Sequence, residues 1–148
     1  MKSNSKRRFV FSLLNILIPI LLGGICYYIF SPDVIFVRRI DAISGLYLHI
    51  DVSGKPILNL IGDFAYDALW AYALLFAVHL ILENKTKHLA LALVIAVVFS
   101  TGMELPQITP FFPGTFDVLD IAIQVFAEFT AVFIKIRKYG GFAYEKNG

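Results

Sequence analysis

The sequence predicts an all-α integral membrane protein: a four-helix transmembrane bundle with an interfacial segment between its first and second helices. Three observations lead to this prediction. Hydrophobic residues make up 58% of the 148 residues and charged residues only 16%, whereas soluble domains carry about 25% charged residues. Four apolar stretches approach the roughly 20 residues that a helix needs to cross a bilayer. Basic residues gather in short segments beside those stretches.

The same composition excludes several other classes of protein. A net charge of +2 is too small to favour a nucleic-acid partner. Cys26 is the only cysteine and lies in an apolar run, so neither a disulfide framework nor a thiolate zinc site is available. The length fits one domain, residues 1–148. We expect no cofactor, and membrane lipids are the first expected partners.

We expect the four spanning helices at residues 9–30, 59–82, 88–105 and 117–136. A basic stretch precedes the first, as in a signal peptide. Its apolar run is too long for one, however, and no small-x-small cleavage site precedes Ser31, so we expect an uncleaved helix. Asp63 and Asp67 interrupt the second helix, and the third is short enough to cross with little tilt.

The segment between the first two helices, residues 31–56, is too apolar for a free loop and too interrupted to span. Leu48, Ile50 and Val52 alternate with polar residues before a turn at Gly54, a pattern typical of a strand. We expect this segment to lie on the outer membrane surface or to cap the helices.

The distribution of basic residues predicts the orientation in the membrane. Ten of them flank the helices on the side of the two termini and of the loop at residues 83–88, and three lie on the other side. Because cytoplasmic flanks carry the excess of lysine and arginine, we expect a multi-pass protein of the cell membrane with both termini in the cytoplasm. We also expect His79 and His88 at that end to be solvated or to lie at the membrane interface.

Polar side chains in the last three helices form the candidate binding site. A carboxylate at the bilayer centre costs about 2.5–3.5 kcal/mol and rarely faces lipid. Helical periodicity places the polar residues of each helix on one face, and the predicted orientation brings most of them to one level near the outer surface. The predicted pocket residues are Asp63, Asp67, Glu104, Gln107, Asp117, Asp120, Gln124 and, deeper, Glu128.

A purely structural role is open for several of these acids. Asp117 could cap its helix and Asp120 could lie in the first turn, where the helix dipole favours negative charge. Asp63 and Asp67 could reach toward interfacial water. Glu104 needs another reason, because a negative charge at the C-terminal end of a helix opposes the dipole. Glu128 also needs one, because it lies well inside its helix.

The polar residues also resemble the signature of the VanZ-like family of small bacterial membrane proteins. In that family a Glu-x-x-Gln pair ends one helix, a Pro-Gly loop follows, and an acidic residue opens the next helix, with a polar amide one turn later. The matching residues are Asp67, Trp70, Glu104, Gln107, Pro113, Gly114, Asp117, Asp120 and Gln124, within residues 59–134. Thr115 and Gln124 stand where the family usually has arginine and asparagine, so an anion contact is not carried over.

The resemblance implies a role in the cell envelope, such as low-level resistance to the glycopeptide teicoplanin, and it implies no reaction. We therefore expect a non-catalytic protein whose outward pocket binds a polar or cationic envelope group. A small proton- or cation-coupled transporter is the first alternative, and it would require an oligomer. A carboxylate-metal enzyme of the membrane is the second. The sequence identifies no catalytic residue and leaves open whether a metal binds.

Overall fold

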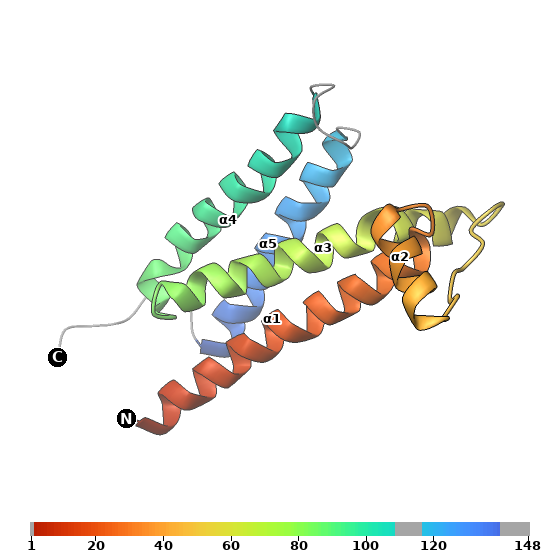
Figure 1. The fold of residues 1–148 in the computed structure, drawn as a ribbon. Helices are drawn as coiled ribbons and strands as arrows, with labels where there is room; N and C mark the ends of the chain where they lie inside the picture. Colours follow the sequence, from red (N-terminus) through yellow and green to blue (C-terminus); the bar gives the residue numbers. More distant parts are fainter. Residues whose placement is uncertain (1, 109–116, 140–148) are drawn as a thin grey trace.

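A computed structural model of the chain describes residues 2–108 and 117–139. These residues form five α-helices and two short 3-10 turns, and no strand occurs among them (Figure 1). The helices are α1 (Lys2–Phe30), α2 (Ile35–Ser44), α3 (Pro56–Ile81), α4 (Leu89–Glu104) and α5 (Val118–Tyr139). The turns η1 (Thr86–His88) and η2 (Leu105–Ile108) precede and follow α4. The all-helical class is therefore as predicted for the described residues.

Three helical segments are long and apolar enough to cross a membrane: Ser5–Phe30, Pro56–Ile81 and Thr86–Glu104. The predicted fourth span corresponds to α5, which forms a helix of 22 residues but does not meet the same standard. It contains Asp120, Glu128 and Lys135 together, whereas each of the three spans has a stretch of 18 residues with at most two charged side chains. The structure thus supports a membrane protein with three apolar spans.

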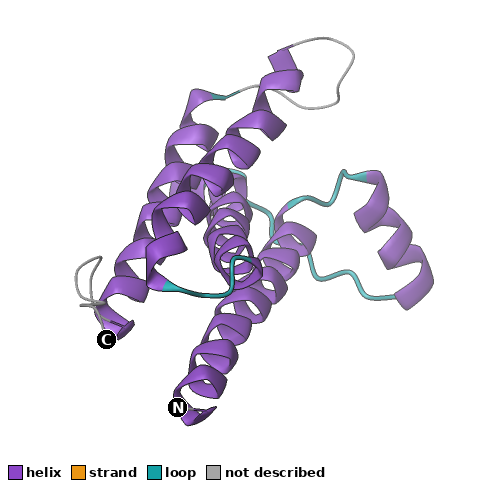
Figure 2. Cartoon of the chain, turned by 90° about the vertical axis from the view of Figure 1, so that its left-hand side faces the viewer, coloured by secondary structure: helices purple, strands orange, loops and turns teal. Residues whose placement is uncertain are grey.

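Among the four long helices α3 is central, because it contacts α1, α4 and α5. In Figure 1, α1 and α3 run side by side, and α4 and α5 form a second pair inclined to the first. Figure 2 shows that α2 stands apart from the four long helices, joined to them by its two connecting segments. The two pairs diverge toward the end at which α4 ends and α5 begins.

Packing between α1 and α3 includes one position where glycine leaves room for a ring, and one polar contact. A Cβ atom on Gly62 would lie 3.0 Å from the Phe30 ring, so the missing side chain makes room for this ring against α3. A Cβ atom on Gly23 would lie 3.6 Å from the Cβ of Leu69, an ordinary van der Waals contact. Deeper along the pair, the Tyr72 hydroxyl donates a hydrogen bond of 2.6 Å to Oδ1 of Asn15.

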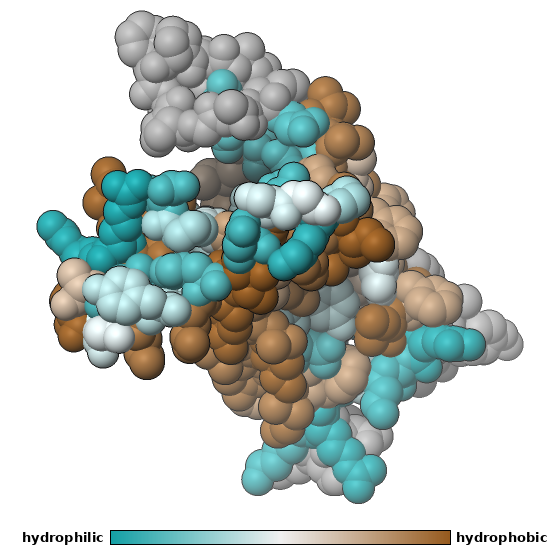
Figure 3. Space-filling model, turned by 90° about the vertical axis from the view of Figure 1, so that its right-hand side faces the viewer, coloured by the Kyte–Doolittle hydropathy of each residue, from teal (hydrophilic) through white to brown (hydrophobic). Residues whose placement is uncertain are grey.

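The core lies where α3, α4 and α5 meet, and much of the remaining helix surface is apolar and exposed. The buried cluster consists of Leu75, Phe76, Leu89, Ala96, Ala131 and Val132. Large hydrophobic side chains such as Leu21, Val98 and Phe126 are 64%, 67% and 74% exposed. In Figure 3 hydrophobic side chains cover the middle of the visible face, with hydrophilic ones above and below. This distribution suits helices that face lipid.

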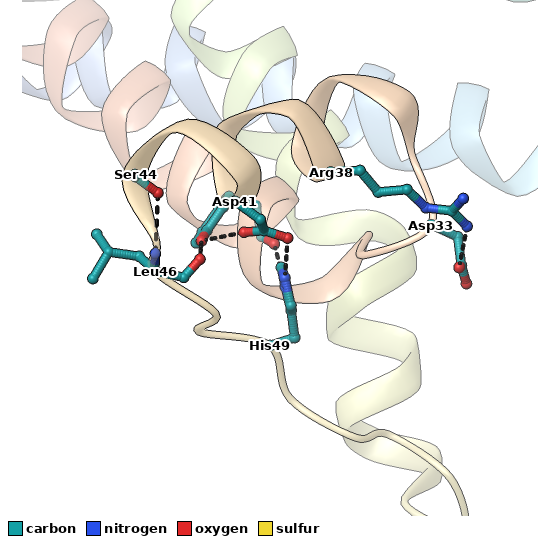
Figure 4. Close-up of polar contacts among 7 residues, drawn as sticks. Asp33, Arg38, Asp41, Ser44, Leu46 and His49 are labelled. Carbon is teal, nitrogen blue, oxygen red and sulfur yellow. Dashed lines mark hydrogen bonds and ion pairs between the residues drawn. The ribbon is translucent and has the colours of Figure 1, made fainter.

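The segment predicted to cap the helices is held to α1 by a polar network (Figure 4). Asp41 of α2 is 6% exposed; its Oδ1 lies 2.6 Å from the Tyr28 hydroxyl, and its Oδ2 lies 2.8 Å from Nε2 of His49. Nδ1 of His49 faces the backbone oxygen of Tyr28 at 3.1 Å. Both imidazole nitrogens of His49 thus face oxygen atoms, and the ring connects α2 to the end of α1.

The sequence left open whether this segment is strand-like or helical; the structure places a helix at Ile35–Ser44 and no regular structure at residues 45–52, so the alternation at Leu48–Val52 forms no strand. A strand needs a partner, and Ile50 makes a single backbone bond, to the oxygen of Ile29 at 3.2 Å. The polar residue His49, one member of this alternating pattern, instead contacts Asp41 and the backbone of Tyr28. The sequence contains no periodic signal for the contact between Asp41 and His49, which are eight residues apart.

Replacing Asp41 with asparagine is expected to release α2 from α1. The hydrogen bond from Tyr28 lowers the pKa of Asp41, with a further contribution from His49. The ionised carboxylate therefore stabilises the docked segment above the ordinary pKa of 3.8, and this contribution is lost as the pH falls below that value. Hydrogen exchange at neutral pH should show faster exchange for residues 35–44 in Asp41→Asn. Asp33→Asn, which removes an exposed ion pair with Arg38, should leave exchange there unchanged.

Candidate functional site

A cavity of about 380 Å³ lies between the diverging helix pairs. Four of the predicted pocket residues line it: Asp67 from α3, Glu104 from α4, Gln107 from η2 and Gln124 from α5. The structure therefore brings together polar side chains from three separate helices and the turn after α4. Its remaining wall consists of Pro19, Ile20, Gly23, Gly24, Tyr27, Tyr66, Trp70 and Met103.

A buried hydrogen bond connects α4 to α5 at this cavity. Nε2 of Gln124 donates to Oε1 of Glu104 at 3.0 Å, and the two side chains belong to residues that are 2% and 7% exposed. The carbonyl oxygen of the same amide, Oε1 of Gln124, is buried and has no hydrogen-bond partner among the described residues. A buried polar atom of this kind is costly when unsatisfied, so it favours a bound polar group or water in the cavity.

The charged side chains that line the cavity are all acidic among the residues that the structure describes. Asp67 and Glu104 supply two carboxyl groups, and no lysine, arginine or histidine is among the lining residues. Asp67 interacts electrostatically with both Glu104 and Asp120. Ionised carboxylates that lie close enough to interact repel one another. The cavity therefore favours a positively charged occupant.

Aromatic rings complete the wall, and they were not predicted as site residues. Tyr27 and Tyr66 pack edge to face with ring centroids 5.3 Å apart. The ring centroids of Trp70 and Phe99 are 6.2 Å apart. Trp70 also lines the cavity. The contribution of α1 was also missed, since its apolar sequence carries no polar residue that would mark a site.

Four predicted pocket residues lie outside the cavity wall, and three of them are Asp63, Asp117 and Asp120. Asp117 is exposed, and its Oδ1 accepts a hydrogen bond of 2.8 Å from the backbone N–H of Leu119. It therefore caps α5, the structural role left open by the sequence. Asp63 is exposed and Asp120 half-buried; the two interact electrostatically with each other. They add negative potential near the cavity without lining it.

Glu128 is fully buried, at 0% exposure, but it does not line the cavity. It lies one turn beyond Gln124 on α5, and both of its carboxyl oxygens lack a hydrogen-bond partner among the described residues. Ser100 of α4 is its polar neighbour, and that hydroxyl donates to the backbone oxygen of Val97 at 3.2 Å. Glu128 is therefore a buried carboxyl group below the cavity, with the Ser100 hydroxyl as its polar neighbour.

A second polar cluster surrounds Lys135, a basic residue near the end of α5. Lys135 is 2% exposed, and its Nζ donates to Ser12 Oγ at 3.3 Å, His79 Nδ1 at 2.8 Å and Asn84 Oδ1 at 3.1 Å. His79 is 4% exposed, so it is not solvated, the first of the two alternatives expected for it. Its Nε2 faces the backbone oxygen of Lys85 at 2.8 Å, which leaves Nδ1 as the acceptor.

A metal site of three or more histidine, cysteine or acidic residues does not occur within residues 2–108 and 117–139. The motif residues Pro113, Gly114 and Thr115 lie outside the described residues. Comparison of the chain with protein-family models, with curated proteins and with solved structures gave no match.

Proposed function

We propose that this chain is a VanZ-like protein of the cell membrane whose acidic cavity binds a cationic group of an envelope molecule. In this proposal α5 is the fourth membrane-spanning helix, both termini are cytoplasmic, and the cavity opens toward the outer surface. The observation that carries the proposal is the cavity itself, where Asp67 and Glu104 face Gln124, whose carbonyl oxygen has no partner among the described residues.

The chemistry of the wall favours an organic cation over a bare metal ion. Carboxylates supply the countercharge, and the faces of Tyr27, Tyr66 and Trp70 can attract an alkylammonium group by cation–π interactions of about 0.5–2 kcal/mol each. Pro19, Ile20 and Met103 can contact an apolar body attached to that group. The carbonyl oxygen of Gln124 can accept a hydrogen bond from an ammonium N–H.

Phenyltrimethylammonium is a suitable test ligand, because tert-butylbenzene has the same shape without the charge. Trp70 is the only tryptophan of the chain and lines the cavity, so its fluorescence reports on occupancy. We expect the cation to change this fluorescence in nanodiscs, and Glu104→Gln or Asp67→Asn to weaken its affinity about tenfold, which corresponds to about 1.4 kcal/mol.

Asp63→Asn is the matched control, since it removes an acid from the same helix as Asp67 at a position outside the cavity wall. We expect its affinity to stay within about twofold of the unaltered chain, a difference of roughly 0.4 kcal/mol. Equal binding of tert-butylbenzene, or unchanged affinity in both Glu104→Gln and Asp67→Asn, would contradict the proposal.

The envelope role can be tested separately from ligand binding. Expression of the chain in a teicoplanin-susceptible bacterium is expected to raise the concentration needed to stop growth, and Glu104→Gln is expected to abolish that gain. The Asp63→Asn variant should retain it. An equal rise in that concentration with Glu104→Gln would show that the resistance does not depend on the cavity.

A cation- or proton-coupled transporter is a second candidate, favoured by the position of Glu128. Its carboxyl group continues the polar face of α5 beyond Gln124, and buried ionisable groups within membrane helices often belong to ion pathways. In proteoliposomes this alternative requires flux that responds to a pH or cation gradient and that is lost in Glu128→Gln. Flux that ignores both gradients would exclude it.

A further inference from the structure

A second cavity, of about 580 Å³, lies where α1 begins and α5 ends, far along both helices from the acidic cavity. Figure 1 shows these two helix ends close together, and the Phe11 and Tyr139 rings pack edge to face with centroids 5.5 Å apart. The lining combines four cations with apolar side chains: Lys6, Arg7, Arg8, Lys138, Val10, Phe11, Leu14 and Tyr139.

The four cations have no acidic partner among the described residues. The ion pairs there join Arg38 to Asp33, His49 to Asp41 and Lys85 to Glu83, and none involves the cavity. The Arg8 guanidinium lies 5.1 Å from the centroid of the Tyr139 ring, and Lys138 Nζ lies 5.8 Å from that of Phe11. The positive charge of the cavity is therefore available to an anion.

The apolar part of the lining favours a lipid over a free anion. Lys6, Arg7 and Arg8 lie in the first turns of the candidate span Ser5–Phe30, the level at which a helix meets phospholipid headgroups. Val10 and Leu14 follow within the span and are 51% and 49% exposed. A lipid phosphate beside the cations would place its acyl chains along these side chains. Basic pockets between membrane helices bind anionic headgroups by this arrangement.

We propose that the cavity formed by Lys6, Arg7, Arg8 and Lys138 binds the phosphate of an anionic phospholipid. On the orientation proposed above, this lipid belongs to the cytoplasmic leaflet. The inference depends on α1 crossing the membrane and is independent of what the acidic cavity binds. Arginine can hold phosphate oxygens with two parallel N–H donors, and lysine adds a point charge.

Native mass spectrometry of the full chain released from detergent tests this proposal with phosphatidylglycerol and phosphatidylcholine as probes. The charge-neutralised variant carries Arg7→Gln, Arg8→Gln and Lys138→Gln. Its matched control carries Arg38→Gln, Arg39→Gln and Lys55→Gln, which removes the same number of positive charges at exposed positions elsewhere. We expect phosphatidylglycerol to bind the control as it binds the unaltered chain and to bind the first variant about tenfold more weakly.

Further measurements distinguish a lipid site from a site for free anions and from a general effect of charge. We expect inorganic phosphate to displace phosphatidylglycerol poorly and higher ionic strength to weaken its binding. Equal binding of phosphatidylcholine, equal loss in both triple variants, or displacement by inorganic phosphate at concentrations similar to those of the lipid would overturn the proposal. If the triple variant does not fold, as judged by circular dichroism, the single variants Arg7→Gln and Lys138→Gln decide the question. Each is expected to weaken phosphatidylglycerol binding about threefold, and unchanged binding in both would overturn the proposal.

Discussion

Replacing Phe76 with alanine is expected to lower the free energy of unfolding by about 3 kcal/mol. Phe76 is 0% exposed, and its ring contacts Phe11 and Tyr72 at centroid distances of 5.9 and 5.1 Å. Alanine would leave a cavity and remove the ring beneath Lys135, whose Nζ lies 4.3 Å from the centroid. The expected loss stays near the lower end of the 3–5 kcal/mol seen in aqueous cores, because lipid weakens the hydrophobic driving force.

Phe126→Ala provides the matched control, since Phe126 is 74% exposed on a neighbouring helix. We expect this change to alter the free energy of unfolding by less than about 0.5 kcal/mol. Reversible denaturation with dodecyl sulfate in mixed micelles, followed by circular dichroism, can measure both variants. Equal losses would show that the contacts of Phe76 do not form the core of the folded protein.

The fold was predictable where hydrophobicity alone decides the structure. Apolar runs predicted the four long helices, although three begin before the expected residue: α1 at Lys2, α3 at Pro56 and α4, through its preceding turn, at Thr86. Basic and polar residues can continue a helix beyond the apolar stretch, so hydropathy marks the span and not the helix end. The short helix α2 was not predicted, because its docking depends on Asp41 and His49 rather than on a long apolar face.

The candidate site was partly predictable for a related reason. Asp67, Glu104, Gln107 and Gln124, which helical periodicity places on the polar face of each helix, line one cavity in the structure. Helical periodicity cannot give the angle between helix pairs, and that divergence decides how far the cavity extends. Asp117 and Asp120 therefore share a helix face with Gln124 yet lie outside the wall. Lys135 illustrates the same limit, because its partners Ser12, His79 and Asn84 come from α1, α3 and the loop after α3.

Replacing Glu128 with leucine is expected to raise the free energy of unfolding by about 1–3 kcal/mol. A buried carboxyl group without hydrogen bonds carries a desolvation cost of this size, and both oxygens of Glu128 lack partners among the described residues. Leucine has a similar volume and can pack against the alanines of the core. The same denaturation assay in mixed micelles measures the change.

Glu104→Leu is the informative comparison, because it removes a buried carboxyl group that does have a partner. Without the Glu104 oxygen, the amide of Gln124 would lose its hydrogen bond of 3.0 Å, so we expect this variant to unfold more easily by about 1–3 kcal/mol. A loss of stability in Glu128→Leu as well would mean that Glu128 is satisfied in the membrane by water or by an ion. A gain would mean that the carboxyl group of Glu128 reduces stability. The protein would then keep this group for another purpose, and an ion pathway along α5 is the purpose to test.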